Sequence, residues 1–139
     1  MHVRIRGIDH VVLRVTDLAA MERFYCGLLG CTLERRQDEI GLIQLRAGQQ
    51  LIDLVAVDGR LGRAGGAAPG VGGRNLDHLC LRLDDDAADL AQLAQALSAA
   101  GVRVGERGRR YGAEGEGESL YLLDPEGNQL ELRAAPLQR

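Results

Sequence analysis

The sequence predicts an α+β fold built from two tandem βαβββ modules. Residues 9–15, DHVVLRV, return as residues 77–83, DHLCLRL, near the start of the second half. Later in each half an apolar segment carries one carboxylate in its middle, LIDL at 51–54 and QLEL at 129–132. Each copy also contains one stripe of apolar residues at helical spacing and several short alternating segments. We therefore place the two modules at residues 5–57 and 75–135.

The first module opens with a predicted strand at residues 5–15, in which apolar and polar residues alternate. Asp17 is placed as the N-cap of a helix that ends at Gly30, and the apolar residues between them recur at helical spacing. Three short strands are predicted at 31–36, 40–46 and 50–57, with a turn at 47–48 between the last two.

Residues 58–74 interrupt the pattern with a stretch rich in Gly and Ala, which buries little apolar surface and is costly to order. We expect a linker or a mobile loop there. The second module then begins with a strand at 76–83, and the aspartates at 84–86 are candidate helix caps. The helix ends at Gly101, and strands follow at 102–106, 118–123 and 128–134, the last two joined by a turn at 124–127.

Composition excludes several classes of function. A chain of 139 residues that is 45% apolar can form one domain with its own core. A net charge of -3 and only 3% aromatic residues argue against a nucleic-acid binder. Three cysteines without CxxC spacing indicate a reducing compartment, and no apolar run is long enough for a membrane span. We therefore expect a cytoplasmic protein that acts on a small molecule.

Four polar side chains occupy matching places in the repeat: His10 and Asp53 in the first module, His78 and Glu131 in the second. Strand alternation turns all four away from the face that the helix of each module covers. If the two sheets curl and face one another, the four side chains converge in a cleft. By the same parity the further candidates for the cleft are Gln44, Tyr121, Arg14 and Arg82.

Imidazole nitrogen and carboxylate oxygen together favour Zn, Ni, Fe or Mn over Ca or Mg. In such a site a carboxylate near the metal could also move a proton, which makes Asp53 and Glu131 candidate catalytic residues. The alternative is structural: a hydrogen-bonded histidine, and a buried carboxylate paired with an arginine such as Arg14, Arg46 or Arg82. The recurrence of both features in the same order favours the metal site.

The pattern resembles the vicinal oxygen chelate superfamily, which includes glyoxalase I, fosfomycin-modifying enzymes, extradiol dioxygenases, methylmalonyl-CoA epimerase and bleomycin-binding proteins. The matching segments are GIDH at 7–10, FYCGLLG at 24–30, DH at 77–78 and SLYLLDPEGNQLEL at 119–132. The resemblance implies that residues 1–139 form a single domain, a U-shaped and partly open mixed-sheet barrel with a central cleft. It also implies a divalent metal at His10, Asp53, His78 and Glu131. Glyoxalase I-like members use His and Glu in both halves, so Asp53 departs from their pattern.

The implied activity is that of a metal-dependent lyase or isomerase like glyoxalase I, acting on a small carbonyl or oxygen-rich substrate or a thiol conjugate. In that reaction the metal holds an enediolate while a carboxylate shuttles the proton, which would be the role of Glu131. A dioxygenase would want further histidines, and only His2 remains. The fosfomycin enzymes place a hydroxyl residue where Val12 stands.

The alternative from another class is a metal-free small-molecule binder of the antibiotic-resistance type, in which the four polar residues pair with arginines. An epimerase or thiol transferase also stays open. Arg107, Arg109 and Arg110 are either an exposed basic loop or a site for an anionic substrate, and Cys80 is expected to pack as a small hydrophobe. Family members of this size usually pair, so we expect a homodimer.

Overall fold

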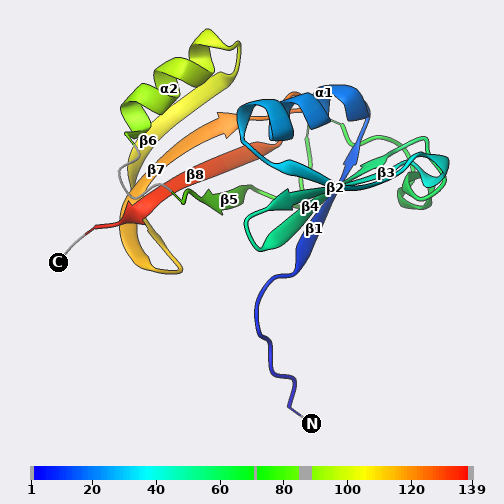
Figure 1. Cartoon of the computed structure of the whole chain (residues 1–139), viewed down its shortest axis with the longest axis horizontal. Helices are drawn as coiled ribbons and strands as arrows, with labels where there is room; N and C mark the ends of the chain where they lie inside the picture. Colours follow the sequence, from blue (N-terminus) through cyan, green and yellow to red (C-terminus); the bar gives the residue numbers. More distant parts are fainter. Residues whose placement is uncertain (1, 71, 85–88, 138–139) are drawn as a thin grey trace. The chain divides into compact units, whose positions relative to one another are not determined.

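The computed structural model describes residues 2–70, 72–84 and 89–137. Contacts divide the chain into two compact units, residues 1–69 and 70–139. Each unit is an open four-stranded mixed sheet with one α-helix, in the order βαβββ (Figure 1). The α+β prediction and the two βαβββ modules are confirmed. Their union into a U-shaped cleft stays a prediction.

The first unit contains the sheet β1-β4-β3-β2, in which β1 runs parallel to β4 and the other neighbours are antiparallel. Its elements are β1 (His10–Val15), α1 (Leu18–Glu22), η1 (Arg23–Leu28), β2 (Thr32–Gln37), η2 (Asp38–Ile40), β3 (Leu42–Ala47), β4 (Gln50–Ala56) and η3 (Gly62–Gly65). The last of these, η3, lies inside the segment predicted as a linker.

The helix of the first unit begins where the sequence places it. The carboxylate of Asp17 accepts a hydrogen bond from the backbone N–H of Ala20 at 3.0 Å, which confirms the predicted N-cap. The helix does not stay regular, because α1 passes into the π-helical η1 after Glu22. Phe24 and Tyr25 of η1 are buried, and their rings meet edge to face with centroids 5.1 Å apart.

Strand β1 is shorter than the predicted strand at 5–15. Its partner β4 begins at Gln50, and the pairing ends with Leu51 opposite His10 and a backbone bond from Leu51 to the carbonyl of Asp9. In the part of the chain that the structure describes, no residue before Asp9 pairs with a strand, and Val3, Ile5 and Ile8 are exposed. Alternation alone predicted a strand, but a strand also requires a partner.

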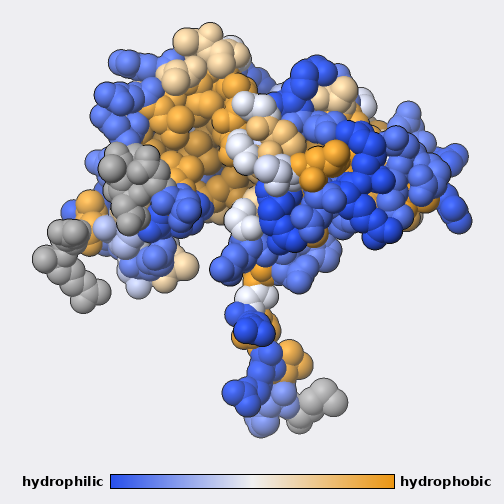
Figure 2. All heavy atoms as spheres, viewed as in Figure 1, coloured by the Kyte–Doolittle hydropathy of each residue, from blue (hydrophilic) through white to orange (hydrophobic). Residues whose placement is uncertain are grey.

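The second unit repeats the topology with the sheet β5-β8-β7-β6, in which β5 is parallel to β8. Its elements are β5 (Leu79–Arg82), α2 (Leu90–Ala99), β6 (Arg103–Gly112), β7 (Gly115–Leu123) and β8 (Gln129–Pro136). Leu90 and Leu97 of α2 are buried, α2 contacts β6 and β7, and apolar side chains gather next to α2 in Figure 2. None of the helices in the described ranges is long and apolar enough to cross a membrane.

Two details of the second unit differ from prediction. Asp89 caps α2, because its carboxylate accepts the N–H groups of Ala91 and Gln92; the predicted caps at residues 85 and 86 lie outside the described residues. Strand β6 continues past residue 106, where it was expected to end, and forms a long hairpin with β7. Glycines and arginines hide this strand from a hydrophobicity pattern, but backbone pairing does not need apolar side chains.

Candidate functional site

The repeat places one histidine beside one carboxylate in each unit by the same register. In the first unit Asp53 on β4 lies opposite Val12, two residues beyond His10. In the second unit Glu131 on β8 lies opposite Cys80, two residues beyond His78. Residues two apart on a strand share a face, so each carboxylate points to the same side of its sheet as the histidine. Two equivalent histidine–carboxylate pairs result.

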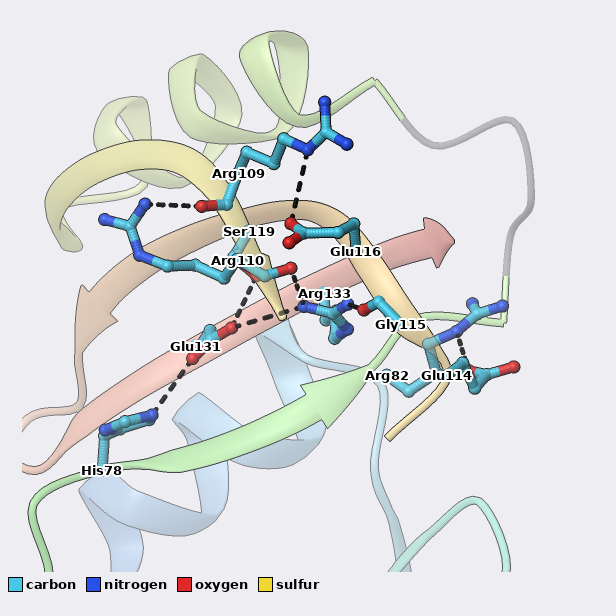
Figure 3. A network of polar contacts seen from close by, with 10 residues as sticks. All are labelled: His78, Arg82, Arg109, Arg110, Glu114, Gly115, Glu116, Ser119, Glu131 and Arg133. Carbon is cyan, nitrogen blue, oxygen red and sulfur yellow. Dashed lines mark hydrogen bonds and ion pairs between the residues drawn. The ribbon is translucent and has the colours of Figure 1, made fainter. Parts of the chain in front are cut away.

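The pair in the second unit is in direct contact. The Nε2 atom of His78 lies 3.1 Å from Oε1 of Glu131, and Ser119 donates its hydroxyl to Oε2 at 2.5 Å (Figure 3). Glu131 is only 5% exposed. Burial opposes its ionisation, but hydrogen bonds from Ser119 and Tyr121 and the charge of His78 outweigh burial and lower its pKa. The carboxylate is therefore held in its ionised form.

The pair in the first unit contains a buried oxygen without a partner. Asp53 is 4% exposed, and its Oδ2 accepts a hydrogen bond from Nε2 of Gln44 at 3.2 Å. Its Oδ1 is buried and has no hydrogen-bond partner among the described residues. A buried carboxylate oxygen left unpaired is costly, so the position is suited to an added cation. Imidazole nitrogen and carboxylate oxygen are ligand types that divalent transition metals take.

Each histidine is oriented by the aspartate that precedes it. Nδ1 of His10 lies 2.7 Å from Oδ1 of Asp9, and Nδ1 of His78 lies 2.8 Å from Oδ2 of Asp77. The hydrogen bond to Asp9 raises the pKa of His10. A carboxylate at Nδ1 orients the ring and leaves Nε2 as the nitrogen that can bind another group.

The further cleft candidates fall into two groups. Gln44 binds Asp53, and the ring of Tyr121 meets that of His78 edge to face at 5.8 Å between centroids, so both lie beside the histidine–carboxylate pairs. Arg14 instead donates to the backbone carbonyls of residues 62, 66 and 67, and Arg82 pairs with Glu114 at 2.7 Å. These two arginines hold neighbouring segments in place.

Sequence reasoning gave no role to Ser119 or Arg133, which complete the surroundings of Glu131. Ser119 is fully buried, and Arg133 lies with Nη1 4.0 Å from Oε2 of Glu131 while donating to the carbonyls of Arg110 and Gly115. The signal for Ser119 was present in the sequence. Ser119 stands two residues before Tyr121 on β7, and Tyr121 lies opposite Glu131 on β8. Ser119 therefore points to the same face of the sheet as Glu131.

No three His, Cys, Asp or Glu side chains form a metal-binding group within the ranges that the structure describes. The first unit brings together His10 and Asp53, the second His78 and Glu131. Each pair offers one nitrogen and one oxygen ligand. Catalytic metal sites generally have three protein ligands and one open position.

Comparisons with known proteins agree with this architecture. An integron cassette protein from V. pseudocholerae has a TM-score of 0.75 at 26% identity, over 99% of this chain and 100% of that one. Virulence protein STM3117 of Salmonella typhimurium has a TM-score of 0.72 at 25% identity, over 95% and 98%. The fold is shared with a lactoylglutathione lyase from Agrobacterium tumefaciens, with a TM-score of 0.67 at 22% identity over 94% and 95%.

No curated protein matches the chain. The sequence model of one family matches residues 7–132, nearly the whole chain, and both histidine–carboxylate pairs lie within that range. The chain therefore belongs to the Glyoxalase/Bleomycin resistance protein/Dioxygenase superfamily, the group of vicinal oxygen chelate proteins that its repeated sequence resembles.

Proposed function

We propose that this chain is a divalent-metal-dependent lyase or isomerase of the glyoxalase type, acting on a small carbonyl or oxygen-rich substrate or its thiol conjugate. The observation that carries the proposal is the unpaired, buried Oδ1 of Asp53 beside His10, at the position that matches Glu131 beside His78. A buried carboxylate oxygen without a hydrogen-bond donor is suited to binding a cation.

The proposed ligands are His10, Asp53, His78 and Glu131. One pair supplies two ligands, fewer than the three that a catalytic ion generally takes from a protein, so we propose that all four side chains serve as ligands. Two imidazoles and two carboxylates are suited to Zn, Ni, Fe or Mn. When bound, such an ion would polarise the oxygen atoms of the substrate.

Glu131 is the proposed base that moves a proton between adjacent carbons. Its carboxylate is ionised, which is the form that accepts a proton, and the hydrogen bond from Ser119 fixes one oxygen while the other faces His78. Asp53 is the second carboxylate and is shorter by one methylene. We propose that it serves as a ligand and neutralises charge.

The contacts of the described residues argue against a metal-free binder. That function requires the polar residues to pair with arginines, yet no arginine pairs with Asp53 among the residues described. Arg46, one candidate partner, binds Glu34 at 2.8 Å instead. Glu131 does form an ion pair with an arginine, Arg133 at 4.0 Å, so the argument against a metal-free binder rests on Asp53.

Turnover assays with reconstituted protein test the reaction class. Metal-stripped protein would be loaded separately with Zn, Ni, Fe and Mn and assayed on methylglyoxal–thiol adducts, catechols and acyl-CoA epimers. We expect turnover of the thiol adducts with at least one metal and its loss on chelation. Turnover of catechols alone would contradict the lyase chemistry, and turnover that survives a chelator would contradict metal dependence.

We propose further that the protein is a cytoplasmic homodimer. The three cysteines of the chain are free, which suits a reducing compartment. Sedimentation at micromolar concentration is expected to give the mass of a dimer, and a monomer would contradict the pairing. Recovery of the native protein outside the cytoplasmic fraction of its host would contradict the location.

A further inference from the structure

A pocket in the second unit begins at His78 and extends along β6 and β7. Its volume is about 610 Å³, and all of its lining residues belong to this unit. Val104, Leu122 and Leu123 contribute apolar surface. The lining also includes two arginines, Arg103 and Arg110, which have no role in the proposed metal chemistry.

Arg110 is held in one position before any ligand arrives. The carbon of its guanidinium lies 5.5 Å from the centre of the Tyr121 ring, a cation–π distance. Nη2 donates to Glu106 at 2.8 Å, and Nη1 donates to the carbonyl of Arg109 at 2.9 Å. The pKa of Arg110 is raised, mainly because its side chain is hydrogen-bonded to Tyr121. The group is thus a fixed, permanent cation with further N–H donors to offer.

Glycine at position 108 makes this position of Arg110 possible. A Cβ atom added to Gly108 would lie 2.5 Å from Nη1 and 3.2 Å from Cζ of Arg110. Any other residue would therefore push the guanidinium aside. The backbone would not be strained, because the φ angle of Gly108 lies outside the left-handed region. Because Gly108 has no side chain, the guanidinium of Arg110 occupies the space that a side chain would take.

Two arginines and two carboxylates line the pocket. The carboxylate of Asp77 is used by His78, and that of Glu106 by Arg110. The guanidinium of Arg110 has N–H groups beyond those that donate to Glu106 and to the carbonyl of Arg109, and these are suited to a carboxylate of a ligand.

The neighbouring arginines do not share this position. Arg109 pairs with Glu116 at 3.3 Å, and Figure 3 shows its side chain leaving β6 in a different direction from that of Arg110. Arg107 and Arg109 are also absent from the residues that line the pocket. Of the three arginines in this basic segment, only Arg110 faces the pocket that begins at His78.

We propose that Arg110 binds a carboxylate group of the substrate and thereby favours carboxylate substrates. This inference rests on the proposed function, because it places the anion beside His78 of the metal site, and it names the substrate class for that site. Arg110 would be a specificity-determining residue, and Gly108 a positioning residue that acts through it.

Binding of a matched pair of probes to metal-stripped protein tests this inference. Benzoate and benzamide share a shape and differ in charge, and amide shifts of isotope-labelled protein would give the Kd of each. We expect benzoate to bind at least about tenfold more tightly than benzamide, as charge-assisted hydrogen bonds imply. Both Arg110→Gln and Gly108→Ala should remove most of that preference, whereas Arg109→Gln should keep it.

The Gly108→Ala variant keeps the whole charge of the protein and displaces only a flexible side-chain end, so it should fold as the parent does. Equal binding of both probes by the parent protein, or an unchanged preference in Arg110→Gln, would overturn the inference. Because no metal is present, failure here leaves the proposed metal chemistry standing. Conversely, a parent protein that prefers benzoate but never binds a metal would overturn the proposed function alone.

Discussion

Replacing Glu131 with glutamine is expected to abolish turnover and to weaken metal binding by at least about 100-fold, since even partners that only orient ligands cost 10–100-fold. The change keeps the shape of the side chain and removes its charge. The hydroxyl of Ser119 can still donate to the amide oxygen, so the buried position stays satisfied. The fold should therefore survive while the ligand and base are lost.

Metal titration of the variant, followed by turnover on the best substrate, measures both effects. Glu118→Gln is the matched control, because it makes the same change on an exposed position of β7. It should behave as the parent protein does. Undiminished metal affinity in Glu131→Gln would show that this carboxylate is not a ligand, even if turnover fell.

Replacing Asp53 with asparagine is expected to move stability and metal affinity in opposite directions. In the metal-free protein the change removes a buried negative charge, one oxygen of which has no partner, and should raise the free energy of unfolding by about 1 kcal/mol. It also removes a proposed ligand, so the affinity for metal should fall by about tenfold or more. Sites kept for function commonly carry such a cost in stability.

Chemical denaturation without metal and metal titration at neutral pH provide the two readouts. Asp58→Asn removes the same charge from an exposed position, and its effect on stability should stay within about 0.5 kcal/mol. A variant at Asp53 that loses stability and binds metal as tightly as the parent would identify this aspartate as a structural residue.

Strand parity was the strongest predictor for this chain. The repeated Asp-His and the lone carboxylate of each apolar segment predict which strand carries each side chain, which face of the sheet it points to, and how the strands are aligned. The parallel pairings β1–β4 and β5–β8 place Asp53 and Glu131 at one common offset from their histidines. Binary alternation suffices for this step, because a shift by one residue would turn the two carboxylates toward the helix-covered face and the apolar side chains away from it.

Other features depend on contacts that local sequence does not encode. The extension of β6 through residue 112 comes from backbone pairing with β7, and a register shift between Val104 and Arg107 decides which arginine faces the pocket. A single irregularity of this kind changes the face of every later side chain. Arg107, Arg109 and Arg110 therefore looked equivalent in the sequence, although only the last lines the pocket.

The number of metal ions bound per chain tests the proposed metal site most directly. Protein would be stripped of metal, titrated with Zn, Ni, Fe and Mn in turn, and compared with His78→Ala treated in the same way. We predict one tightly bound ion per chain for the parent protein and almost none for the variant. Less than about one-tenth of an equivalent in the parent, or equal binding by both proteins, would contradict a site built from the two histidine–carboxylate pairs.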